Sequence, residues 1–364
     1  MHISELETPA LLIDLDRMER NLCRVAHYAK EHDLRLRPHT KTHKIPAIGK
    51  KQIELGAAGL TVAKVGEAEV MLASGTPDLL VAYPVIGHSK LRRLMEVARQ
   101  TRLTVALDSV QAARQLSDAA RAAQVTVGVL AEADVGMNRC GVRVGEELIA
   151  LARAITRLPH LTLEGVAFYP GHIRSASEEN QRLLDQLAAD AAQIVEDFRA
   201  ADLPLNILSA GSTPLLYHSH EFAGITEIRP GTYVFHDVNC VRSGMASWED
   251  CAVTILTTVV STARKGYAII DGGSKTFSSD RLAGSNELSF GHVTEAPDAV
   301  YYSQNEEHGY LEVRKCDREF QVGDRLRIVP NHVCVAMNLH EQVHGIRGEK
   351  VELVWKVEGR GKLQ

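Results

Sequence analysis

Short apolar runs alternate with amphipathic stretches over the first two thirds of the chain. The runs have the length of buried strands, and they are ALLIDL, LRLRPH, GLTVAK, DLLVAYP, LTVALD, VTVGVLAE, LEGVAFY, LNILSAG and ITEIRPG. Between them, apolar residues recur at helical spacing over residues 17–32, 65–74, 91–100, 110–123, 146–156 and 178–200. This alternation predicts parallel βα units, and their number favours a closed TIM-type (β/α)8 barrel over an open sheet. Because such a barrel uses eight strands, the first run is expected to be shared in part with another domain.

The pattern changes after residue 235, where strand signals continue without long helices. The apolar runs there are AVTILTTVVSTA, YAIIDGG, YLEV, RLRIVP and VELVWKV, separated by Gly, Asp and Asn. Such a pattern is typical of an antiparallel β-domain. We therefore expect an α/β barrel over residues 10–238 and a second, mainly antiparallel β-domain formed by residues 239–364 together with residues 1–9.

Composition narrows the range of partners. The 364 residues are 45% hydrophobic and 24% charged, with a formal net charge of -5. No long basic stretch is present, so nucleic acid and anionic membrane are poor candidates and a small molecule is favoured. No run approaches the roughly 18 apolar residues of a membrane span, and the N-terminus lacks a signal-peptide pattern. We expect a cytoplasmic protein, and the six scattered cysteines do not indicate a disulfide framework.

The segment LRLRPHTKTHK concentrates two lysines and two histidines within six residues, directly after a predicted strand. Leu34 and Leu36 alternate with arginines, which is strand periodicity, and Pro38 ends the run. Strand ends are where α/β proteins place their chemistry. A desolvated lysine near other cations can form a Schiff base with a carbonyl compound. The ordinary alternative is a basic, solvated loop.

Two glycine turns follow late strands of the predicted barrel. The first is SAGSTP at residues 209–214, and the second is RPGTY at residues 229–233. Barrels bind phosphate through loops of this kind and through helix N-termini. Each could be an ordinary turn, but two of them in a barrel with an early lysine indicate a phosphorylated cofactor.

At this point the sequence resembles the fold-type III pyridoxal-phosphate (PLP) enzymes, the alanine racemase-like barrels. Within them it is most similar to the D-threonine aldolase and D-serine dehydratase branch. The resemblance covers nearly the whole chain. It rests on RPHTKTHK, DVGMNRCGV from Asp134, YPGH from Tyr169, SAGSTP, EIRPGTYVFHD from Glu227, DGGSK from Asp271, EEHG from Glu306 and PNHVCVAMNL from Pro330.

The resemblance implies that Lys41, rather than Lys44, forms the Schiff base with PLP. Lys44 is then a surface or structural residue. The residues that would hold the cofactor phosphate are Ser212, Thr213, Gly231 and Tyr233.

Other positions of the implied cofactor site carry distinct roles. Arg139 corresponds to the family arginine near the phenolic oxygen of the cofactor, and Tyr169 is expected to stack on the cofactor or to bond to it. Arg229 stands where the racemases place an arginine against the pyridine nitrogen. Such a permanent cation weakens the cofactor as an electron sink, so the reaction needs help from elsewhere. His172 and His308 are candidates to relay the proton of a substrate hydroxyl.

That help is expected from a divalent metal, Zn or Mn. His332 and Cys334 are two residues apart on a predicted strand, which would place both side chains on one face. Imidazole and thiolate suit Zn, and two protein ligands leave positions open for water and substrate. By resemblance, the His-Cys pair is typical of the dehydratases, whereas the C-terminal VELVWKVEGRGK is closer to the aldolases. The ordinary alternative is a core cysteine beside a loop histidine.

The expected function is a PLP- and metal-dependent lyase for D-β-hydroxy-α-amino acids. Retro-aldol cleavage to glycine and an aldehyde is the leading reaction, as in D-threonine aldolase. The alternative is dehydration of D-serine or D-threo-3-hydroxyaspartate to a 2-oxo acid and ammonia. Racemisation is disfavoured because racemases lack the metal pair, and a non-catalytic PLP-binding protein is disfavoured because such proteins are single barrels. By resemblance, we expect a homodimer.

Overall fold

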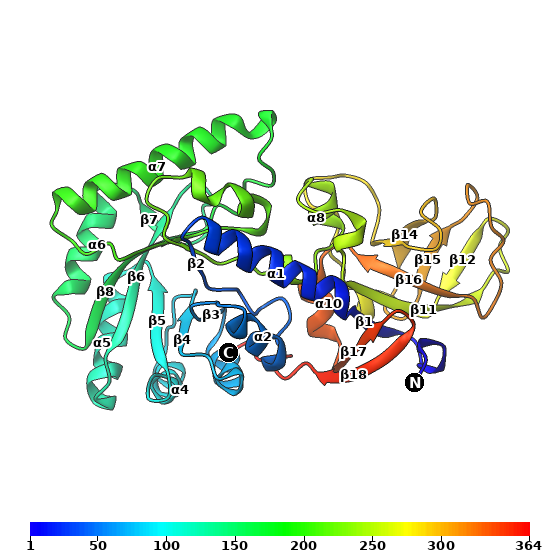
Figure 1. Cartoon of the computed structure of the whole chain (residues 1–364), viewed down its shortest axis with the longest axis horizontal. Helices are drawn as coiled ribbons and strands as arrows, with labels where there is room; N and C mark the ends of the chain where they lie inside the picture. The colour runs from blue at the N-terminus through cyan, green and yellow to red at the C-terminus, as the bar shows by residue number, and fades with distance from the viewer. The chain divides into compact units, whose positions relative to one another are not determined.

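The computed structural model describes residues 1–364, and the chain divides into two compact units (Figure 1). One, called the barrel unit, contains residues Cys23–Lys41, Pro46–Gly231 and Gly361–Gln364. The other, called the β unit, contains Met1–Leu22, Thr42–Ile45 and Thr232–Arg360. No helix combines the length and the apolar character needed to cross a lipid bilayer.

The strands of the barrel unit form one parallel ring, in the order β2-β10-β9-β8-β6-β5-β4-β3. A parallel bridge between His39 and Thr61 joins the two ends of this order, so the ring closes. A short strand, β7 (Val142–Arg143), pairs with β6 outside the ring. The expected (β/α)8 barrel is confirmed. Its strands are β2 (Arg35–Leu36), β3 (Leu60–Val62), β4 (Asp78–Val81), β5 (Arg102–Leu107), β6 (Val127–Asp134), β8 (Leu161–Phe168), β9 (Ile207–Ala210) and β10 (Glu227–Ile228).

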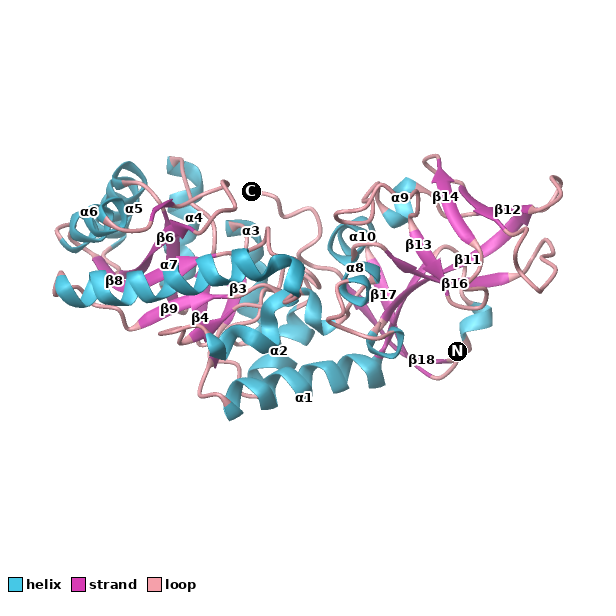
Figure 2. Cartoon of the chain, turned by 90° about the horizontal axis from the view of Figure 1, so that it is seen from above, coloured by secondary structure: helices cyan, strands magenta, loops and turns pink.

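The helices of this unit lie outside the ring, and most of them follow one of its strands (Figure 2). They are α1 (Leu15–Glu31, whose second half belongs to this unit), α2 (Pro46–Glu54), α3 (Val65–Met71), α4 (His88–Ala98), α5 (Val110–Ala123), α6 (Glu146–Thr156) and α7 (Gln181–Ala200). Short 3-10 helices extend or replace some of them: η2 (Leu72–Ser74), η3 (Glu178–Asn180) and η4 (Thr213–Glu221). The bounds of α5 and α6 match the predicted ranges. Helix α5 begins after Ser109, whose hydroxyl accepts the N–H of Ala112.

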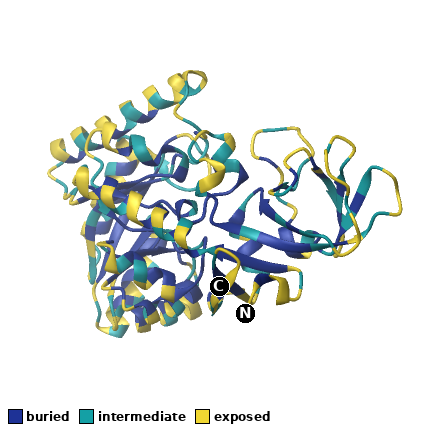
Figure 3. Ribbon diagram, turned by 45° about the vertical axis from the view of Figure 1, so that its right-hand side comes forward, coloured by how far each residue is buried: buried dark blue, intermediate teal, exposed yellow.

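Each strand of the ring presents alternate residues to the helices and to the barrel interior. Residues such as Leu79 and Val81 pack with the helices in the main apolar core. The opposite faces of the strands form a second, separate cluster inside the ring, which consists of Leu80, Ala106, Leu130, Ala167 and Ile207. Figure 3 shows the strands of this unit as buried and the outer helix faces as exposed.

The β unit contains nine strands in the order β12-β15-β14-β13-β16-β11-β1-β17-β18. Strand β12 also pairs with β11, which closes six of the strands into a barrel. All pairs are antiparallel except β1 with β17, so the predicted mainly antiparallel domain is confirmed. The strands are β1 (Ala10–Asp14), β11 (Val253–Ser261), β12 (Tyr267–Ile270), β13 (Gly291–Val293), β14 (Val300–Gln304), β15 (Gly309–Glu312), β16 (Arg325–Pro330), β17 (Gln342–Arg347) and β18 (Lys350–Lys356).

The first apolar run of the sequence therefore belongs to the β unit. Strand β1 pairs with β11 and β17 and contributes no hydrogen bond to the ring of the barrel unit. Short helices complete the β unit, and they are η1 (Ile3–Glu5), η5 (Thr232–Val234), α8 (Val238–Arg242), η6 (Trp248–Asp250), α9 (Ser274–Phe277) and α10 (Val333–Leu339).

Candidate active site

The predicted cofactor residues of the barrel unit follow the carboxyl ends of five strands. Because all strands of the ring are parallel, these ends meet at one rim of the barrel. The residues are Lys41 after β2, Arg139 after β6, Tyr169 and His172 after β8, Ser212 and Thr213 after β9, and Arg229 and Gly231 after β10. The topology thus brings together at one rim residues that are far apart in the sequence.

Lys41 lies in a turn that the barrel holds from two sides. The N–H of His39 donates to the carbonyl of Pro230 at 2.9 Å, and the N–H of Thr40 donates to the carbonyl of Thr61 at 2.8 Å. The ammonium group of Lys41 lies 5.8 Å from the centre of the Tyr169 ring. The position of the lysine is therefore set by backbone contacts to the neighbouring strands β10 and β3.

Tyr169 also supports the predicted arginine. The guanidinium of Arg139 lies 4.9 Å from the centre of the Tyr169 ring, which is cation–π distance. A Cβ atom at Gly171 would lie 2.2 Å from Cε1 of Tyr169, so the YPGH segment requires glycine at this position. The side chains of Lys41 and Arg139 thus both lie near the ring of Tyr169.

Arg229 is buried inside the barrel and anchored by one of its nitrogens. Its Nη2 donates to the carbonyl oxygens of Phe168 at 2.8 Å and of Ser209 at 3.3 Å. Burial lowers the pKa of Arg229, and the negative charges of Glu227 and Glu132 oppose that shift. The Nε atom is buried without a hydrogen-bond partner. Such an unsatisfied donor is available to an acceptor atom of a bound molecule.

The first predicted phosphate loop contains a second unsatisfied group. Ser212 has extended backbone angles and directly precedes η4, and its side chain makes no capping bond to that helix. The Oγ atom of Ser212 is buried and has no hydrogen-bond partner. A helix start with an unused hydroxyl suits an anion. In the second loop, Gly231 is buried at the end of a barrel-unit segment, and Tyr233 is buried in the β unit.

The two predicted histidine relays differ in their surroundings. His172 is partly buried, and its Nδ1 atom has no hydrogen-bond partner. Its Nε2 atom would lie 3.2 Å from a Cβ at Gly136, so the ring packs against the loop after β6. His308 is exposed in the turn between β14 and β15 of the β unit. His172 therefore lies with the residues of the barrel rim, whereas His308 belongs to a hairpin of the other unit.

The predicted metal pair does not lie on a strand, and this expectation was wrong. Strand β16 ends at Pro330, His332 is the extended residue before α10, and Cys334 lies in the first turn of that helix. The two side chains nevertheless meet, because they are hydrogen-bonded to each other. The thiolate charge of Cys334 and the carboxylate of Asp237 raise the pKa of His332 to about 11, against the opposing effect of burial. No group of three or more His, Cys, Asp or Glu side chains that could hold a metal is present.

Sequence reasoning missed several charged residues inside the barrel, among them Glu132, which interacts electrostatically with the predicted site residues Arg229 and Arg139. Burial raises the pKa of Glu132, and the charges of Arg229 and Arg139 oppose that shift. Its Oε2 atom is buried without a hydrogen-bond partner. The signal was present in the run VTVGVLAE, where a carboxylate follows Leu130 at a spacing of two and therefore points to the same interior face.

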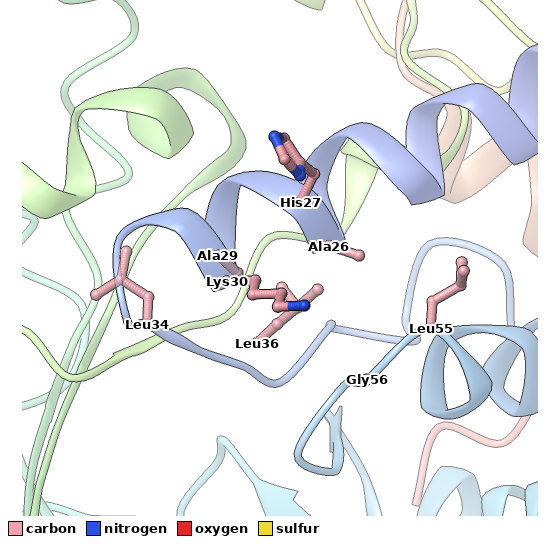
Figure 4. Close-up of a pocket in the computed structure, with 8 residues that line it drawn as sticks. All are labelled: Ala26, His27, Ala29, Lys30, Leu34, Leu36, Leu55 and Gly56. Atoms are coloured by element: carbon pink, nitrogen blue, oxygen red, sulfur yellow. The ribbon is translucent and has the colours of Figure 1, made fainter.

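A surface pocket of about 330 Å³ lies elsewhere on the barrel unit (Figure 4). It is formed by α1, β2 and the residues after α2, and Lys30 and His27 are its only titratable side chains. None of the predicted site residues lines it, so it is not the candidate active site. The lining residues are Ala26, His27, Ala29, Lys30, Leu34, Leu36, Leu55 and Gly56.

A closed parallel barrel joined in one chain to an antiparallel β-domain, with a lysine at the barrel rim, defines the alanine racemase class of fold. Comparison with family sequence models agrees. The model described as alanine racemase, N-terminal domain, matches residues 13–238, and the model described as putative serine dehydratase domain matches residues 252–346.

Individual relatives narrow the class further. The chain is 34% identical to 3-hydroxy-D-aspartate aldolase of Paracoccus denitrificans, over 100% of this chain and 94% of the relative. The crystal structure of D-threonine aldolase from Filomicrobium marinum superposes with a TM-score of 0.92 at 31% identity, covering 99% and 97% of the two chains. The structure of D-threo-3-hydroxyaspartate dehydratase from Delftia sp. HT23 superposes with a TM-score of 0.89 at 32% identity, covering 98% of each chain. The chain belongs to the fold-type III PLP enzyme family, in the branch of these aldolases and dehydratases.

Proposed function

We propose that the protein is a PLP- and divalent metal-dependent lyase that cleaves D-β-hydroxy-α-amino acids to glycine and an aldehyde. The observation that carries the proposal is the arrangement at the barrel rim. Lys41 and Arg139 flank Tyr169 there, and Arg229 and Ser212 each keep one buried polar atom without a partner. The relatives named above include two aldolases of this substrate class.

The residues present fit PLP. Ser212 Oγ and the backbone at Thr213, Gly231 and Tyr233 would hold the phosphate, and Arg229 Nε would donate to the pyridine nitrogen. Arg139 would face the phenolic oxygen, Tyr169 would support the cofactor, and Lys41 would bind its aldehyde carbon. When bound, PLP withdraws electrons from the α-carbon of the amino acid. Because Arg229 is a cation that donates and keeps its proton, this withdrawal is weaker than with a carboxylate partner.

Two residues of the chain can move the protons that the reaction requires. For cleavage of the bond between Cα and Cβ, a base must remove the proton of the β-hydroxyl, and we assign this role to His172, whose Nδ1 has no partner in the structure. For elimination of the hydroxyl, Lys41 must instead remove the α-proton. Cleavage or elimination is selected by the substrate bond at Cα that stands perpendicular to the plane of the cofactor ring.

His332 and Cys334 fit a divalent metal such as Zn or Mn, which would act as a Lewis acid toward the β-hydroxyl of the substrate. Imidazole and thiolate are Zn ligands, and the remaining positions would be taken by water and substrate. Solved variants described as D-threo-3-hydroxyaspartate dehydratase have the same spacing of histidine and cysteine. They include a histidine-to-alanine variant and, two residues further along, a cysteine-to-alanine variant described as metal-free.

A dehydratase is the second candidate, because by resemblance the His332 and Cys334 pair is typical of the dehydratases. The product would then be a 2-oxo acid with ammonia, from D-serine or D-threo-3-hydroxyaspartate. The 32% identity to the Delftia dehydratase is similar to the 31% identity to the D-threonine aldolase, so sequence identity does not favour one reaction over the other.

Product analysis tests the proposal directly. The PLP-loaded protein is incubated with Zn or Mn and with D-threonine, D-serine or D-threo-3-hydroxyaspartate, and the products are identified. Glycine with an aldehyde supports the aldolase, whereas ammonia with a 2-oxo acid supports the dehydratase. Chelation and His332→Ala should each abolish the reaction. Full activity in His332→Ala would rule out the metal assignment, and turnover of none of the three substrates would rule out the lyase.

The same proposal includes the organisation of the chain and its assembly. We propose that the predicted domain of residues 10–238 binds PLP and that residues 1–9 with 239–364 carry the metal ligands. In the structure, residues 10–22, 42–45 and 232–238 belong to the β unit, so the barrel unit is smaller than the predicted domain. We propose a homodimer, which the resemblance to this branch implies, and a cytoplasmic location. Light scattering of the purified protein should give twice the mass of 39.9 kDa, and a monomer mass would refute the dimer.

A further inference from the structure

Asp237 is a fully buried carboxylate that connects two helices of the β unit. Its Oδ1 atom accepts the N–H of Cys240 at 3.0 Å and so caps α8. Its Oδ2 atom accepts the N–H of Val333 at 3.1 Å and lies 2.9 Å from Nδ1 of His332. Capping of α8 requires only one of the two oxygens. The second oxygen is committed to the start of α10 and to the imidazole.

The contact with Asp237 determines which ring nitrogen of His332 is available. A carboxylate acceptor at Nδ1 requires that this nitrogen carries a hydrogen. The lone pair of the neutral ring is then on Nε2, the nitrogen that faces away from Asp237. In metal sites, a carboxylate bonded to the second nitrogen of a histidine ligand fixes its tautomer and orientation.

Thr42 provides a corresponding partner for the cysteine. It is fully buried in the β unit, and its Oγ1 atom lies 3.2 Å from Sγ of Cys334. Either atom can donate while the sulfur is a thiol, but a thiolate bound to a metal carries no hydrogen, so the hydroxyl would then be the donor and would fix the position of the sulfur. Thr42 is bonded to Lys41, so the partner of the thiolate and the predicted Schiff-base lysine are consecutive residues.

We propose that Asp237 and Thr42 are positioning residues for the metal, Asp237 for the imidazole of His332 and Thr42 for the thiolate of Cys334. The inference rests on the metal assignment in the proposed function. It adds that each of the two ligands is set by one buried partner, and that Nε2 rather than Nδ1 of His332 binds the ion. If Asp237 and Thr42 had a purely structural role, every variant of them that folds would bind the metal with unchanged affinity.

Metal affinity of the PLP-loaded protein tests the proposal, measured as the dissociation constant for Zn in competition with a chromophoric chelator. Asp237→Asn should weaken Zn binding by about 10- to 100-fold, as the loss of such partners does in other metal sites. The matched control is Asp250→Asn, because Asp250 also caps a helix of the β unit but does not contact His332. Unchanged Zn affinity in Asp237→Asn would overturn the role of Asp237.

Thr42 is tested by a pair of variants. Thr42→Val removes the hydroxyl at constant shape and should weaken Zn binding by about tenfold, whereas Thr42→Ser should restore most of it. The control is Thr257→Val, since Thr257 is equally buried in the β unit and bonds to the carbonyl of Leu326. With Co in place of Zn, the thiolate-to-metal absorption band should shift in Thr42→Val and stay unchanged in Thr257→Val. Equal affinity and an unshifted band would overturn the role of Thr42.

A measurement on the wild type avoids variants that fail to fold. Nitrogen NMR of the Zn-loaded protein with labelled histidine should show Nδ1 of His332 protonated and Nε2 bound to the metal. Coordination through Nδ1 would overturn the inference while leaving the metal assignment in place. Absence of Zn and Mn binding in the wild type would overturn the metal assignment itself, and the inference with it.

Discussion

Arg37 and Asp78 form a two-bond ion pair inside the barrel, with Nη1 to Oδ1 at 2.7 Å and Nη2 to Oδ2 at 3.2 Å. The Nε atom of Arg37 donates to Glu227 at 2.8 Å, and the hydroxyl of Ser209 donates to the other oxygen of Glu227 at 2.7 Å. All four side chains are buried. This network fixes the strand that leads, four residues later, to Lys41.

Removal of the arginine should therefore destabilise the fold strongly. Arg37→Met removes the hydrogen-bonded cation of two buried carboxylates, which keep only longer contacts such as those to Arg35 at 3.7 and 4.0 Å. Breaking such a buried pair costs about 3–5 kcal/mol in the free energy of unfolding. Denaturant unfolding followed by circular dichroism measures the change. Arg121→Met is the control, because Arg121 forms an exposed pair with Asp118 and should contribute less than about 1 kcal/mol. A similarly small loss for Arg37→Met would contradict the importance of the buried network.

The buried Glu132 should make stability depend on pH. Burial raises its pKa above the ordinary value of 4.5 in the folded state, so the folded protein binds this proton more tightly than the unfolded chain. The protonated carboxyl contributes stability at a pH below the pKa that Glu132 has in the unfolded chain. This contribution is lost as the pH rises from that pKa through the higher pKa of the folded state. Glu132→Gln cannot ionise and should lose less thermal stability than the wild type as the pH rises above 4.5. Parallel melting-temperature profiles of the two proteins would contradict this prediction.

The unpartnered hydroxyl of Ser212 should contribute to cofactor affinity. Ser212→Ala removes a bond to a charged phosphate and should raise the dissociation constant of PLP by about tenfold. The control is Ser219→Ala in helix η4, which Ser212 precedes, because the Ser219 hydroxyl already donates to the carbonyl of Leu215. Equilibrium dialysis measures both constants. The phosphate assignment fails if the two variants bind PLP equally well.

Most of the fold could be predicted because its strands and helices leave a local pattern of apolar and polar residues in the sequence. Strands and helices of the barrel followed from runs whose periodicity and caps are local, as in the helix that begins after Ser109. The error at His332 and Cys334 was also a matter of local pattern. Val333, Ala336 and Met337 are buried at helical spacing, and this signal favoured α10 over the strand that was predicted.

The partners of buried charges could not be predicted in the same way. Alternation shows that Arg37 points to one face of its strand, but Glu227 lies 190 residues away and only the closed ring brings the two together. The same holds for Asp237 and His332, which are 95 residues apart and meet at the ends of two short helices. For the residues of the barrel rim, resemblance to a family supplied what periodicity could not.

Covalent binding of PLP by Lys41 is the central claim about this protein. Borohydride reduction of the PLP-loaded wild type, followed by digestion and peptide mass spectrometry, identifies the modified lysine. We predict a single phosphopyridoxyl group on Lys41, with Lys44 unmodified. A group on Lys44 or on another lysine, or no modification at all, would contradict the central claim.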